Sequence, residues 1–231
     1  MRVRQLRKED VHEATALIEA GHMSNATELA KQLAGHPLGS LVVALFAVCG
    51  GALAVRQGGD GIVLVCATIC GVLVGFTSLR GLASWALLQY VAQCRRSDMA
   101  DPIASYDPRR RAVLLVAEGR GNGVPPGIVG TLAVRPYEGA AEGPTAELKR
   151  VSTRADARGC GVASALIAAG ESWAIDHGYR EIVLTTSSFQ PAALTLYARR
   201  GYREVPHLRQ PFSGIGWCGA IRHHFTKALR A

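Results

Sequence analysis

The sequence has few of the features that mark metal-binding or disulfide-bonded proteins. None of its 6 cysteines forms a Cys-x-x-Cys pair, and their spacing is irregular. The single adjacent histidine pair, His223-His224, has no cysteine or carboxylate at ligand spacing nearby. We therefore expect no metal site and no disulfide framework, and we expect reduced thiols in a domain that faces the cytosol.

Lysine and aromatic residues are also scarce. Of the 26 basic residues only 4 are lysine, and aromatic residues make up 6% of the chain. The net charge of +8 is compatible with nucleic acid, an anionic membrane surface or a polyphosphate ligand as a partner. Because the aromatic residues do not alternate with the basic ones, a stacking surface for nucleic acid is not expected.

Charge is missing altogether from two long stretches, residues 38–55 and 61–79. As helices they would be about 27–28 Å long, close to the roughly 30 Å of a bilayer core. The short glycine-rich link at residues 56–60 favours a helical hairpin that spans the membrane or re-enters it. The alternative is a pair of buried helices in a soluble protein. A signal peptide does not fit, because the apolar part begins too far into the chain.

The flanks of these stretches are basic, which predicts that both face the cytosol. The basic residues concerned are Arg2, Arg4, Arg7, Lys8, Lys31, Arg80, Arg95 and Arg96. Residues 81–92, with Trp85 and Tyr90, are typical of an interfacial helix or of an ordinary amphipathic helix on the domain. We expect three regions: 1–36 with the first strand and helices, 37–94 with the hairpin and interfacial helix, and 95–231 with the main domain.

Outside the hairpin the pattern is α/β. Strands are predicted at 3–6, 111–119, 127–136, 146–153 and 179–186, and helices at 8–20, 25–35 and from Pro191 to a stop at Gly201. Asp10 lies near the start of the first helix, and Gly21 is expected just past its end. Residues 214–229 are ambiguous between strand and helix.

The segment Arg158-Gly159-Cys160-Gly161 connects a predicted strand to a helix with Val162, Leu166, Ala169 and Trp173 on its buried face. Free N–H groups at a helix start form an anion site, and glycine allows a phosphate to approach closely. The segment lacks the Lys-Ser/Thr of a P-loop, so a nucleoside triphosphate is not expected. Taken alone, it is equally compatible with a tight turn.

The surrounding residues resemble the GNAT acetyltransferase superfamily. Arg158, Gly161 and Ala163 match its Arg/Gln-x-x-Gly-x-Gly/Ala motif. The later helix motif is matched by Gln190, Ala193, Leu196, Tyr197, Gly201 and Tyr202. The resemblance implies a mostly antiparallel central sheet, splayed between its middle strands and flanked by helices, with acetyl-CoA bound in the splay.

Residues 95–106, together with "ELKRVS", resemble the membrane-associated branch of that superfamily. This branch contains the N-acetylaspartate synthetases and the cysteine-S-conjugate N-acetyltransferases, and "ELKRVS" is more similar to the former. The resemblance implies an endoplasmic reticulum membrane. Asp98 and Asp101 are interpreted either as residues at the mouth of the substrate site or as caps of a helix at Pro102.

The resemblance also implies a binding site for acetyl-CoA. Its pyrophosphate would bind the N–H groups of Gly159, Cys160, Gly161, Val162 and Ala163, with Arg158 adding a charged contact. The pantetheine would pair with the strand at Val151 and Thr153. Gln190 would contact the pantetheine or cap the last helix.

Three side chains are candidates for the chemistry. Tyr197 is the candidate general acid for the leaving thiolate, since a phenol stays protonated at neutral pH. Glu147 is the candidate base, directly or through water. Arg150 is the candidate clamp for a substrate carboxylate. A core tyrosine, an exposed glutamate and a structural ion-pair arginine are the respective alternatives. Cys160 is not expected to be a nucleophile, because direct transfer needs no acyl-enzyme.

Together these features predict a membrane-tethered N-acetyltransferase that moves acetyl from acetyl-CoA to a small, aspartate-like amine. Alternative acceptors are a cysteine S-conjugate and a protein lysine. A non-catalytic CoA-binding membrane adaptor is the alternative of another class. The expected partners are the amine and membrane lipid, without nucleic acid or metal, and the oligomeric state stays open.

Overall fold

A computed structural model describes residues 1–121, 123–139, 144–211 and 220–229. The chain divides into two compact units, which are taken separately below. The first unit comprises Met1–His22, Tyr90–Arg209 and Arg222–Ala231. The second comprises Met23–Gln89 and Gln210–Ile221. The first unit is therefore assembled from pieces that lie far apart in the sequence.

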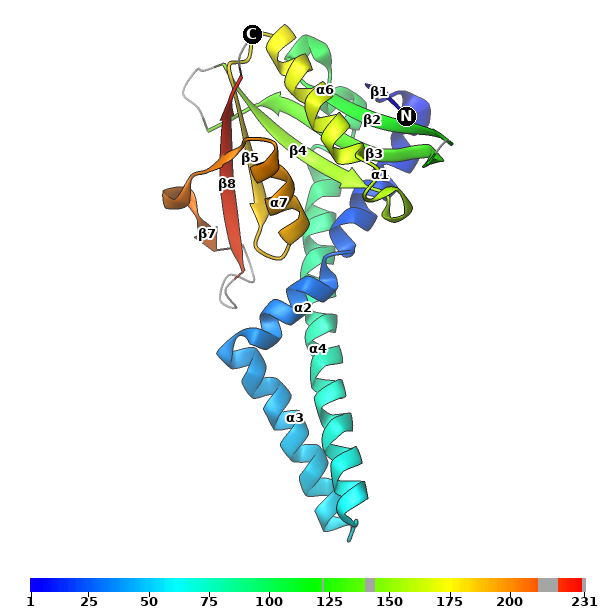
Figure 1. Cartoon of the computed structure of the whole chain (residues 1–231), viewed down its shortest axis with the longest axis vertical. Helices are drawn as coiled ribbons and strands as arrows, with labels where there is room; N and C mark the ends of the chain where they lie inside the picture. Colours follow the sequence, from blue (N-terminus) through cyan, green and yellow to red (C-terminus); the bar gives the residue numbers. More distant parts are fainter. Residues whose placement is uncertain (122, 140–143, 212–219, 230–231) are drawn as a thin grey trace. The chain divides into compact units, whose positions relative to one another are not determined.

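A mixed sheet forms the centre of the first unit (Figure 1). Its strands, in the spatial order β1-β2-β3-β4-β5-β8-β6, are β1 (Arg2–Gln5), β2 (Val113–Gly121), β3 (Val124–Pro136), β4 (Thr145–Thr153), β5 (Glu181–Ser187), β8 (Ile221–Ala228) and β6 (Arg203–Glu204). Among the neighbouring strands of this order, as far as the structure describes them, only β4 and β5 pair in parallel, so the predicted mostly antiparallel sheet is confirmed. The ambiguous tail forms β8 from Ile221 onward, whereas residues 214–219 lie outside the described residues. The short β7 (Gln210–Pro211) precedes them.

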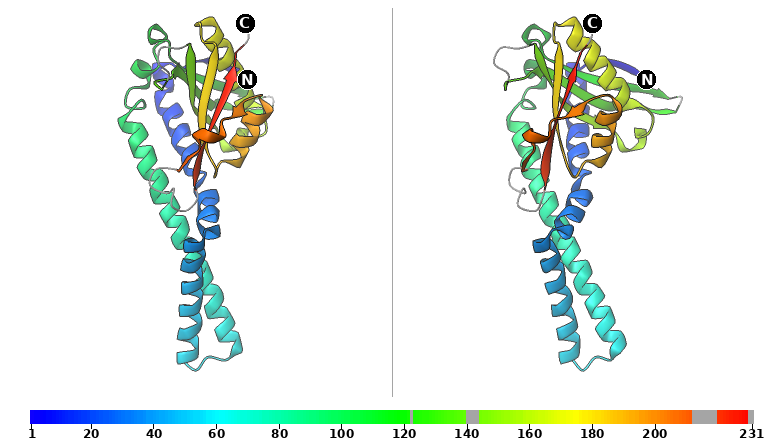
Figure 2. Two further views of the ribbon diagram at one scale, coloured as in Figure 1. Left: turned by 90° about the vertical axis from the view of Figure 1, so that its left-hand side faces the viewer. Right: turned by 60° about the vertical axis from the view of Figure 1, so that its left-hand side comes forward.

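Helices cover both faces of this sheet (Figures 1 and 2). On one face α6 (Val162–Asp176) and α7 (Pro191–Arg199) enclose a core that includes Leu132, Leu148, Leu166, Ile167, Leu184 and Phe225. On the other, α1 (Val11–Met23) packs with residues 94–106 over Leu114 and Val116. That stretch includes α5 (Pro102–Ser105). Elsewhere in the chain, single 3-10 turns lie at Lys8–Asp10, Pro108–Arg110, Ala155–Ala157 and Pro206–Leu208.

Helix α1 does not end before Gly21, as the sequence predicts, but continues to Met23. The reason is close packing. A Cβ atom on Gly21 would lie 1.8 Å from the Oγ of Ser152 on β4. The Ser152 hydroxyl also donates a hydrogen bond of 3.2 Å to the carbonyl of Leu17. The glycine thus allows the helix to approach the strand, and its role is steric rather than helix-terminating.

Acidification is expected to destabilise the first unit through His22. Burial, followed by the charge of Arg150, lowers the pKa of His22 to about 4. Between pH 6.5 and 4 the unfolded chain therefore binds a proton that the folded chain does not, so stability falls as the pH falls. The expected loss is about 3 kcal/mol in the denaturant-derived free energy of unfolding at pH 4 relative to pH 7.

In this experiment His22→Gln should make the free energy of unfolding depend less on pH than it does in the wild type. The control is His12→Gln, at an exposed position of the same helix. If the two variants have the same pH dependence as the wild type, His22 is not the residue responsible.

The second unit contains the predicted pair of apolar helices. It consists of α2 (Ala26–Gly35), α3 (Pro37–Arg56) and the first part of α4 (Gly61–Arg96). Helices α3 and α4 run side by side in each view (Figures 1 and 2). Glycine permits this contact, because a Cβ on Gly50 would lie 2.4 Å from the Ala67 carbonyl oxygen and one on Gly71 would lie 2.3 Å from that of Phe46. In the link, Asp60 accepts hydrogen bonds from the first N–H groups of α4.

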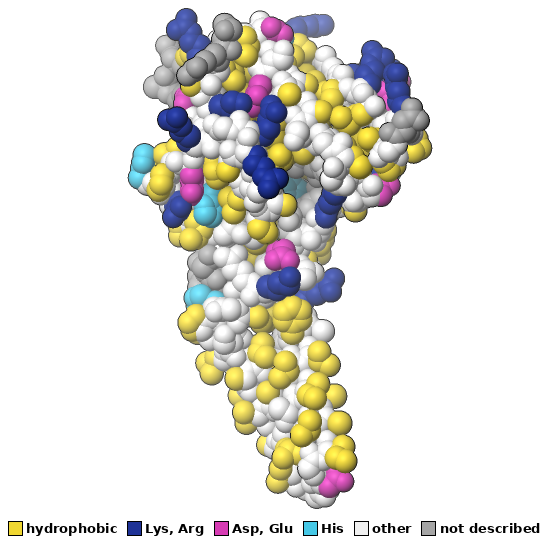
Figure 3. Space-filling model, in the orientation of Figure 1, with side chains coloured by type: hydrophobic (Ala, Val, Ile, Leu, Met, Phe, Trp, Pro, Cys, Tyr) yellow, Lys and Arg dark blue, Asp and Glu magenta, His cyan; other side chains and the backbone are white. Residues whose placement is uncertain are grey.

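Both helices are long and apolar enough to cross a membrane, and only 17% of the apolar window in each is buried. Hydrophobic side chains cover much of the visible surface of α3 and α4 (Figure 3). A pair of buried helices in a soluble core would have most of these side chains covered. The exposure therefore weighs against that alternative.

Residues 81–92 do not form a separate helix. They are part of α4, which continues without interruption for 36 residues. At 1.5 Å per residue its length is about 54 Å, well beyond the thickness of a bilayer core. Trp85 is 59% exposed, and Tyr90 marks the point at which the helix enters the first unit. This continuity is not visible in the sequence, because the change from apolar to amphipathic composition resembles a boundary between two helices.

Candidate active site

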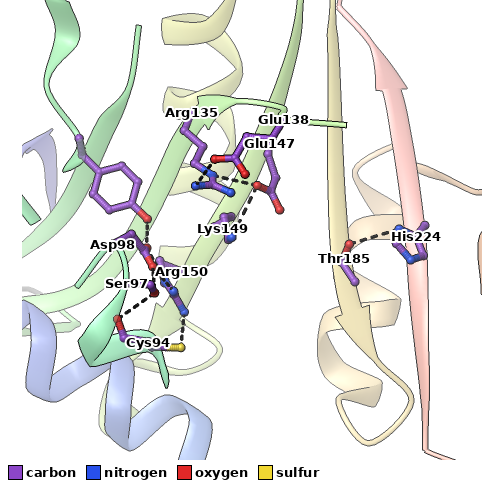
Figure 4. Close-up of polar contacts among 11 residues, drawn as sticks. Cys94, Ser97, Asp98, Arg135, Glu138, Glu147, Lys149, Arg150, Thr185 and His224 are labelled. Carbon is purple, nitrogen blue, oxygen red and sulfur yellow. Dashed lines mark hydrogen bonds and ion pairs between the residues drawn. The ribbon is translucent and has the colours of Figure 1, made fainter. Parts of the chain in front are cut away.

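The central feature of the site is a separation of two neighbouring strands. The parallel pairing of β4 with β5 ends at Leu148 and Leu184. Beyond that point β4 stays paired with β3, while β5 stays paired with β8 as far as Ser187. The two strands therefore diverge in the middle of the sheet (Figure 4). The predicted splay is observed.

A β-bulge in β4 lies where the strands part. Ala133 pairs with Lys149 and Thr131 pairs with Ser152, so β4 contains one more residue than β3 between these pairs. Arg150, in the bulge, has a positive φ of 54°, which is uncommon for a residue other than glycine. Its carbonyl accepts a hydrogen bond of 2.8 Å from the Thr131 hydroxyl. Bulges of this kind redirect a strand and often lie beside functional sites.

Beyond the bulge, β4 presents main-chain groups toward the splay. The N–H of Arg154 donates to the Val129 carbonyl at 2.9 Å, which fixes the register. Because hydrogen-bonding groups alternate along an antiparallel strand, the N–H and C=O groups of Val151 and Thr153 point away from β3. They face the side from which β5 has diverged. An extended ligand can pair with these groups as an added strand would.

The start of α6 has the geometry of an anion site. Gly159 and Gly161 have φ values of 80° and 77°, and no atom lies within 4 Å of a Cβ built on either. The first N–H groups of the helix, from Val162 and Ala163 onward, have no acceptor within the helix. Arg158 and Cys160 are exposed beside them. The Cys160 thiol contacts the carbonyl of Gly123 at 3.3 Å, so only its main chain contributes to the helix start.

Gln190 precedes α7, but its side chain does not cap that helix. Instead its amide oxygen accepts hydrogen bonds from the Thr186 hydroxyl at 3.0 Å and from the Ser187 N–H at 3.3 Å. The interpretation of Gln190 as a helix cap is therefore wrong. The side chain closes the end of β5, the strand that forms the far wall of the splay.

Tyr197 lies in the core between α7 and the sheet. It is 6% exposed and belongs to the same cluster as Leu148 and Leu184, where the pairing of β4 with β5 ends. Burial raises the pKa of Tyr197 above its usual value. The phenol is therefore protonated across the neutral pH range and available as a donor.

Glu147 points to the opposite face of the sheet from Tyr197, because it precedes Leu148 on β4. Its Oε2 atom accepts a hydrogen bond of 2.9 Å from Arg135 and lies 3.6 Å from the Lys149 ammonium (Figure 4). The side chain is 16% exposed. Glu147 is thus a sheltered, ion-paired carboxylate rather than an exposed residue at a strand end.

A pocket opens on the Glu147 face, beside the splay. Its polar lining residues are Tyr137, Glu147, Thr185, His224 and Thr226. The rest of its wall is aliphatic and aromatic, and none of the described residues that line it carries a permanent positive charge. The pocket can therefore receive an amine with an apolar side chain without leaving a cation uncompensated.

The prediction that Arg150 binds a substrate carboxylate does not agree with the structure. The Arg150 side chain is 4% exposed, and its guanidinium donates to both Asp98 oxygens, at 2.9 and 2.5 Å (Figure 4). Its third nitrogen donates to the Cys94 thiol at 2.9 Å. Asp98 also accepts hydrogen bonds from Ser97 and Tyr106. Arg150 is a structural ion-pair residue that anchors the bulge.

Asp98 is not a free carboxylate, because both of its oxygens accept hydrogen bonds from Arg150. Burial alone would raise the pKa of Asp98, but the hydrogen bonds and charge of Arg150 hold it well below its usual range. Asp101 caps α5 by accepting a hydrogen bond of 3.0 Å from the Ala104 N–H. Within the described residues, no group of three His, Cys, Asp or Glu side chains can hold a metal ion.

Two lining residues, Thr185 and His224, did not emerge from the sequence as site candidates. In the sequence, His224 stands out only as half of a histidine pair that has no other metal ligands nearby. The signal was weak because residues 214–229 were ambiguous between strand and helix, which left the facing direction of the histidine undefined. Pairing of β8 with β5 places His224 opposite Thr185.

Comparisons with known proteins agree with this geometry. Residues 79–202 match the family described as "Acetyltransferase (GNAT) family". N-acetyltransferase 8 of Mus musculus is 30% identical over 205 residues, which cover 88% of this chain and 85% of that protein. N-acetyltransferase 8F1 of Rattus norvegicus is 40% identical over 55% of each chain.

Among solved structures, an acetyltransferase of the GNAT family from Staphylococcus aureus Mu50 has a similar fold. Its TM-score is 0.53, with 11% identity and 99% of each chain covered. The splay, the glycine-started helix and these relatives lead to the same assignment. The chain belongs to the GNAT acetyltransferase family, with N-acetyltransferase 8 proteins among its relatives, and is an N-acetyltransferase.

Proposed function

We propose that this enzyme transfers the acetyl group of acetyl-CoA directly to the amine of a small, amino-acid-like substrate. The observation that carries the proposal is the divergence of β4 from β5 at Leu148 and Leu184, just before the glycine-started helix α6. One ligand can thereby bind both an exposed strand edge and a helix start, which suits the pantetheine and pyrophosphate of acetyl-CoA.

For the donor, the proposed contacts are main-chain groups. Val151 and Thr153 pair with the pantetheine amides, and the N–H groups of residues 159–163 bind the pyrophosphate. Arg158 adds positive charge at the exposed loop. Gln190 contributes by fixing the end of β5 beside the pantetheine, since its amide oxygen is already bound to Thr186 and Ser187.

A valine at position 161 is expected to weaken binding of acetyl-CoA. The φ of 77° is unfavourable for a β-branched residue, and a side chain there would occupy the space that the phosphate needs. We expect Gly161→Val to raise the KM for acetyl-CoA at least about tenfold, which corresponds to about 1.4 kcal/mol. The measurement is initial-rate kinetics at saturating amine.

The matched control is Gly58→Val in the helical link. It has a φ of 69°, with open space around a built Cβ. Both variants should be destabilised by similar backbone strain. An equal KM in the two variants would contradict the proposed pyrophosphate site.

The proposed chemistry uses the two faces of the sheet. Glu147, on the pocket side, takes a proton from the acceptor directly or through a water molecule. Tyr197, on the side of α7, donates a proton to the departing thiolate. The two side chains thus act on opposite sides of the bond that is exchanged. Support comes from their positions at the strand divergence and from the raised pKa of Tyr197.

The acceptor is proposed to carry an apolar group. Of the two small acceptors considered, S-substituted cysteine suits the pocket better than aspartate, because the pocket has an acidic residue and an apolar wall. Arg150, the cation that would have bound a second carboxylate, is committed to Asp98. A protein lysine is less favoured, since the pocket is small and is lined by residues of five segments.

The test is a panel of amines assayed with purified full-length enzyme and acetyl-CoA by release of CoA thiol. The panel contains S-benzyl-L-cysteine, L-aspartate, free amines and a lysine peptide. We expect the highest kcat/KM with S-benzyl-L-cysteine. Release that never exceeds hydrolysis with any amine would contradict an enzymatic role and favour a CoA-binding adaptor. A preference for aspartate would contradict the apolar acceptor.

The helical hairpin is proposed to tether the enzyme to the endoplasmic reticulum membrane, with the catalytic unit in the cytosol. The support is the length and exposure of α3 and α4 and the basic flanks. In this proposal 1–36 and 95–231 form the catalytic domain and 37–94 form the membrane region. Carbonate washing of microsomes tests it, and complete release of the protein would contradict the tether.

A further inference from the structure

His224 shares the acceptor pocket with Glu147. It lies on β8, opposite Thr185 on β5, just past the residues where β5 leaves β4. Figure 4 shows Thr185 and His224 on the strands across the splay from Glu147 and Lys149. The imidazole therefore lies on the wall opposite the ion-paired carboxylate, beside the position at which the acceptor amine must meet the acetyl group.

The two ring nitrogens of His224 have different surroundings. Nδ1 lies 3.3 Å from the Thr185 hydroxyl oxygen. Nε2 is buried and, among the residues that the structure describes, has no hydrogen-bond partner. A buried polar atom without a partner costs about 1–3 kcal/mol, so such atoms are uncommon unless a ligand satisfies them. With its proton on Nδ1, directed at Thr185, the ring has a free lone pair on Nε2.

Burial and the neighbouring positive charges keep His224 neutral. Burial is the main cause of its lowered pKa, and the neighbouring charges of Arg222 and His223 on the same strand add to the effect. From the other elements, Glu147 on β4 and Tyr137 after β3 line the same pocket, while β5 contributes Thr185. Glu147 is engaged by Arg135 and Lys149. The imidazole is thus the uncharged acceptor of this pocket at neutral pH.

We propose that His224 accepts, through Nε2, the proton of the acceptor's ammonium group before acetyl transfer. This inference rests on the proposed function. The N–H bond of the ammonium breaks, an Nε2–H bond forms, and the freed amine lone pair attacks the thioester carbonyl. When the carbon–sulfur bond breaks, the thiolate takes the proton of Tyr197. As the amide forms, its nitrogen gives its second proton to Glu147, directly or through water, and this proton passes by way of solvent to the Tyr197 phenolate. The imidazolium then returns its proton to water. Glu147 orients the amine and balances the imidazolium charge.

The experiment measures kcat/KM for S-benzyl-L-cysteine between pH 5 and 8 in the full-length enzyme. Over this range the substrate stays an ammonium ion, so an acid limb reports a base on the enzyme. In the wild type, the acid limb should lie below about pH 6.5, the ordinary pKa of histidine, because burial lowers the pKa of His224. In His224→Gln, which retains a polar side chain without a basic nitrogen, kcat/KM should fall about 100-fold and the acid limb should disappear. The KM for acetyl-CoA should not change.

His223→Gln is the matched control. His223 is next to His224 on β8 but points to the opposite face, where its Nδ1 contacts a Glu204 oxygen at 2.7 Å. This variant should keep both the rate and the acid limb. A second variant, Thr185→Val, removes the partner of Nδ1 and should lower kcat/KM about fivefold, the value of one neutral hydrogen bond. If His224→Gln does not bind acetyl-CoA and is therefore misfolded, the kinetics of Thr185→Val decide whether His224 acts in the reaction.

The outcomes separate the two proposals. A wild-type rate and an unchanged acid limb in His224→Gln would overturn the role of His224 and leave the proposed function intact. If His224→Gln is misfolded, a wild-type kcat/KM in Thr185→Val would likewise overturn the role of His224 and leave the proposed function intact. A wild-type enzyme without activity on any amine would contradict the proposed function, and the role of His224 with it.

Discussion

Asp98→Ala is expected to destabilise the catalytic unit by about 3–5 kcal/mol. Removal of the carboxylate leaves the Arg150 guanidinium, whose side chain is only 4% exposed, without its counter-charge. A buried charge without a partner is among the most costly defects in a folded protein. The measurement is the free energy of unfolding of the full-length protein from urea denaturation in detergent. We also expect loss of activity, because Arg150 lies in the bulge where β4 leaves β5.

The control for this prediction is Asp156→Ala. Asp156 pairs with Arg154 at 2.7 Å, but the carboxylate is 57% exposed, so its loss should cost less than about 1 kcal/mol. A double variant, Asp98→Leu with Arg150→Met, should recover part of the stability, because neither charge then remains buried. Equal destabilisation by the Asp98 and Asp156 variants would mean that the buried ion pair is not the anchor inferred here.

Tyr197→Phe is expected to lower kcat by about 100-fold or more, with little change in the affinity for acetyl-CoA. The substitution removes one oxygen atom from a ring that is 6% exposed and leaves the packing of the core in place. Because burial raises the pKa of Tyr197, its phenol is protonated from pH 6 to 9, and the loss should be the same throughout that range. Steady-state kinetics with S-benzyl-L-cysteine and isothermal titration with CoA provide the two measurements.

Tyr202→Phe is the matched control, since Tyr202 is 4% exposed and its ring centroid lies 5.8 Å from that of Tyr197. The same atom is removed from the same cluster, so the cost to packing is comparable. Turnover should stay close to the wild-type value. If both variants lose turnover equally, the effect arises from the core and Tyr197 is not the acid.

The elements that the sequence predicted well are those with a local signal. The strand before residue 154, the glycines at 159 and 161 and the amphipathic α6 follow one another within about thirty residues, and each has its own periodicity or turn residue. The splay followed from resemblance to a family rather than from such patterns. It depends on where β4 and β5 stop pairing, and no residue between Thr145 and Leu148 marks that point.

The parts that could not be predicted depend on contacts between distant residues. In the sequence Arg150 resembles a free cation that could bind a substrate, because its ion-pair partner Asp98 lies 52 residues away. Gly21 resembled a helix terminator because the strand against which it packs begins more than a hundred residues later. His224 could not be placed on a face until β8 was paired with β5. In each case the residue type was visible, but the neighbour that determines its role was not.

The interruption of the first unit by the second has a consequence for the order of folding. Strand β1 pairs with β2 in the register Arg2 to Glu118, and α1 packs beneath β4. During synthesis the first edge of the sheet therefore waits until the whole hairpin has left the ribosome. If the hairpin enters the bilayer as proposed, the enzyme assembles only after its anchor has been inserted. A simple truncation that removes the hairpin would remove β1 and α1 with it, so a soluble catalytic fragment requires His22 and Tyr90 to be rejoined by a designed linker.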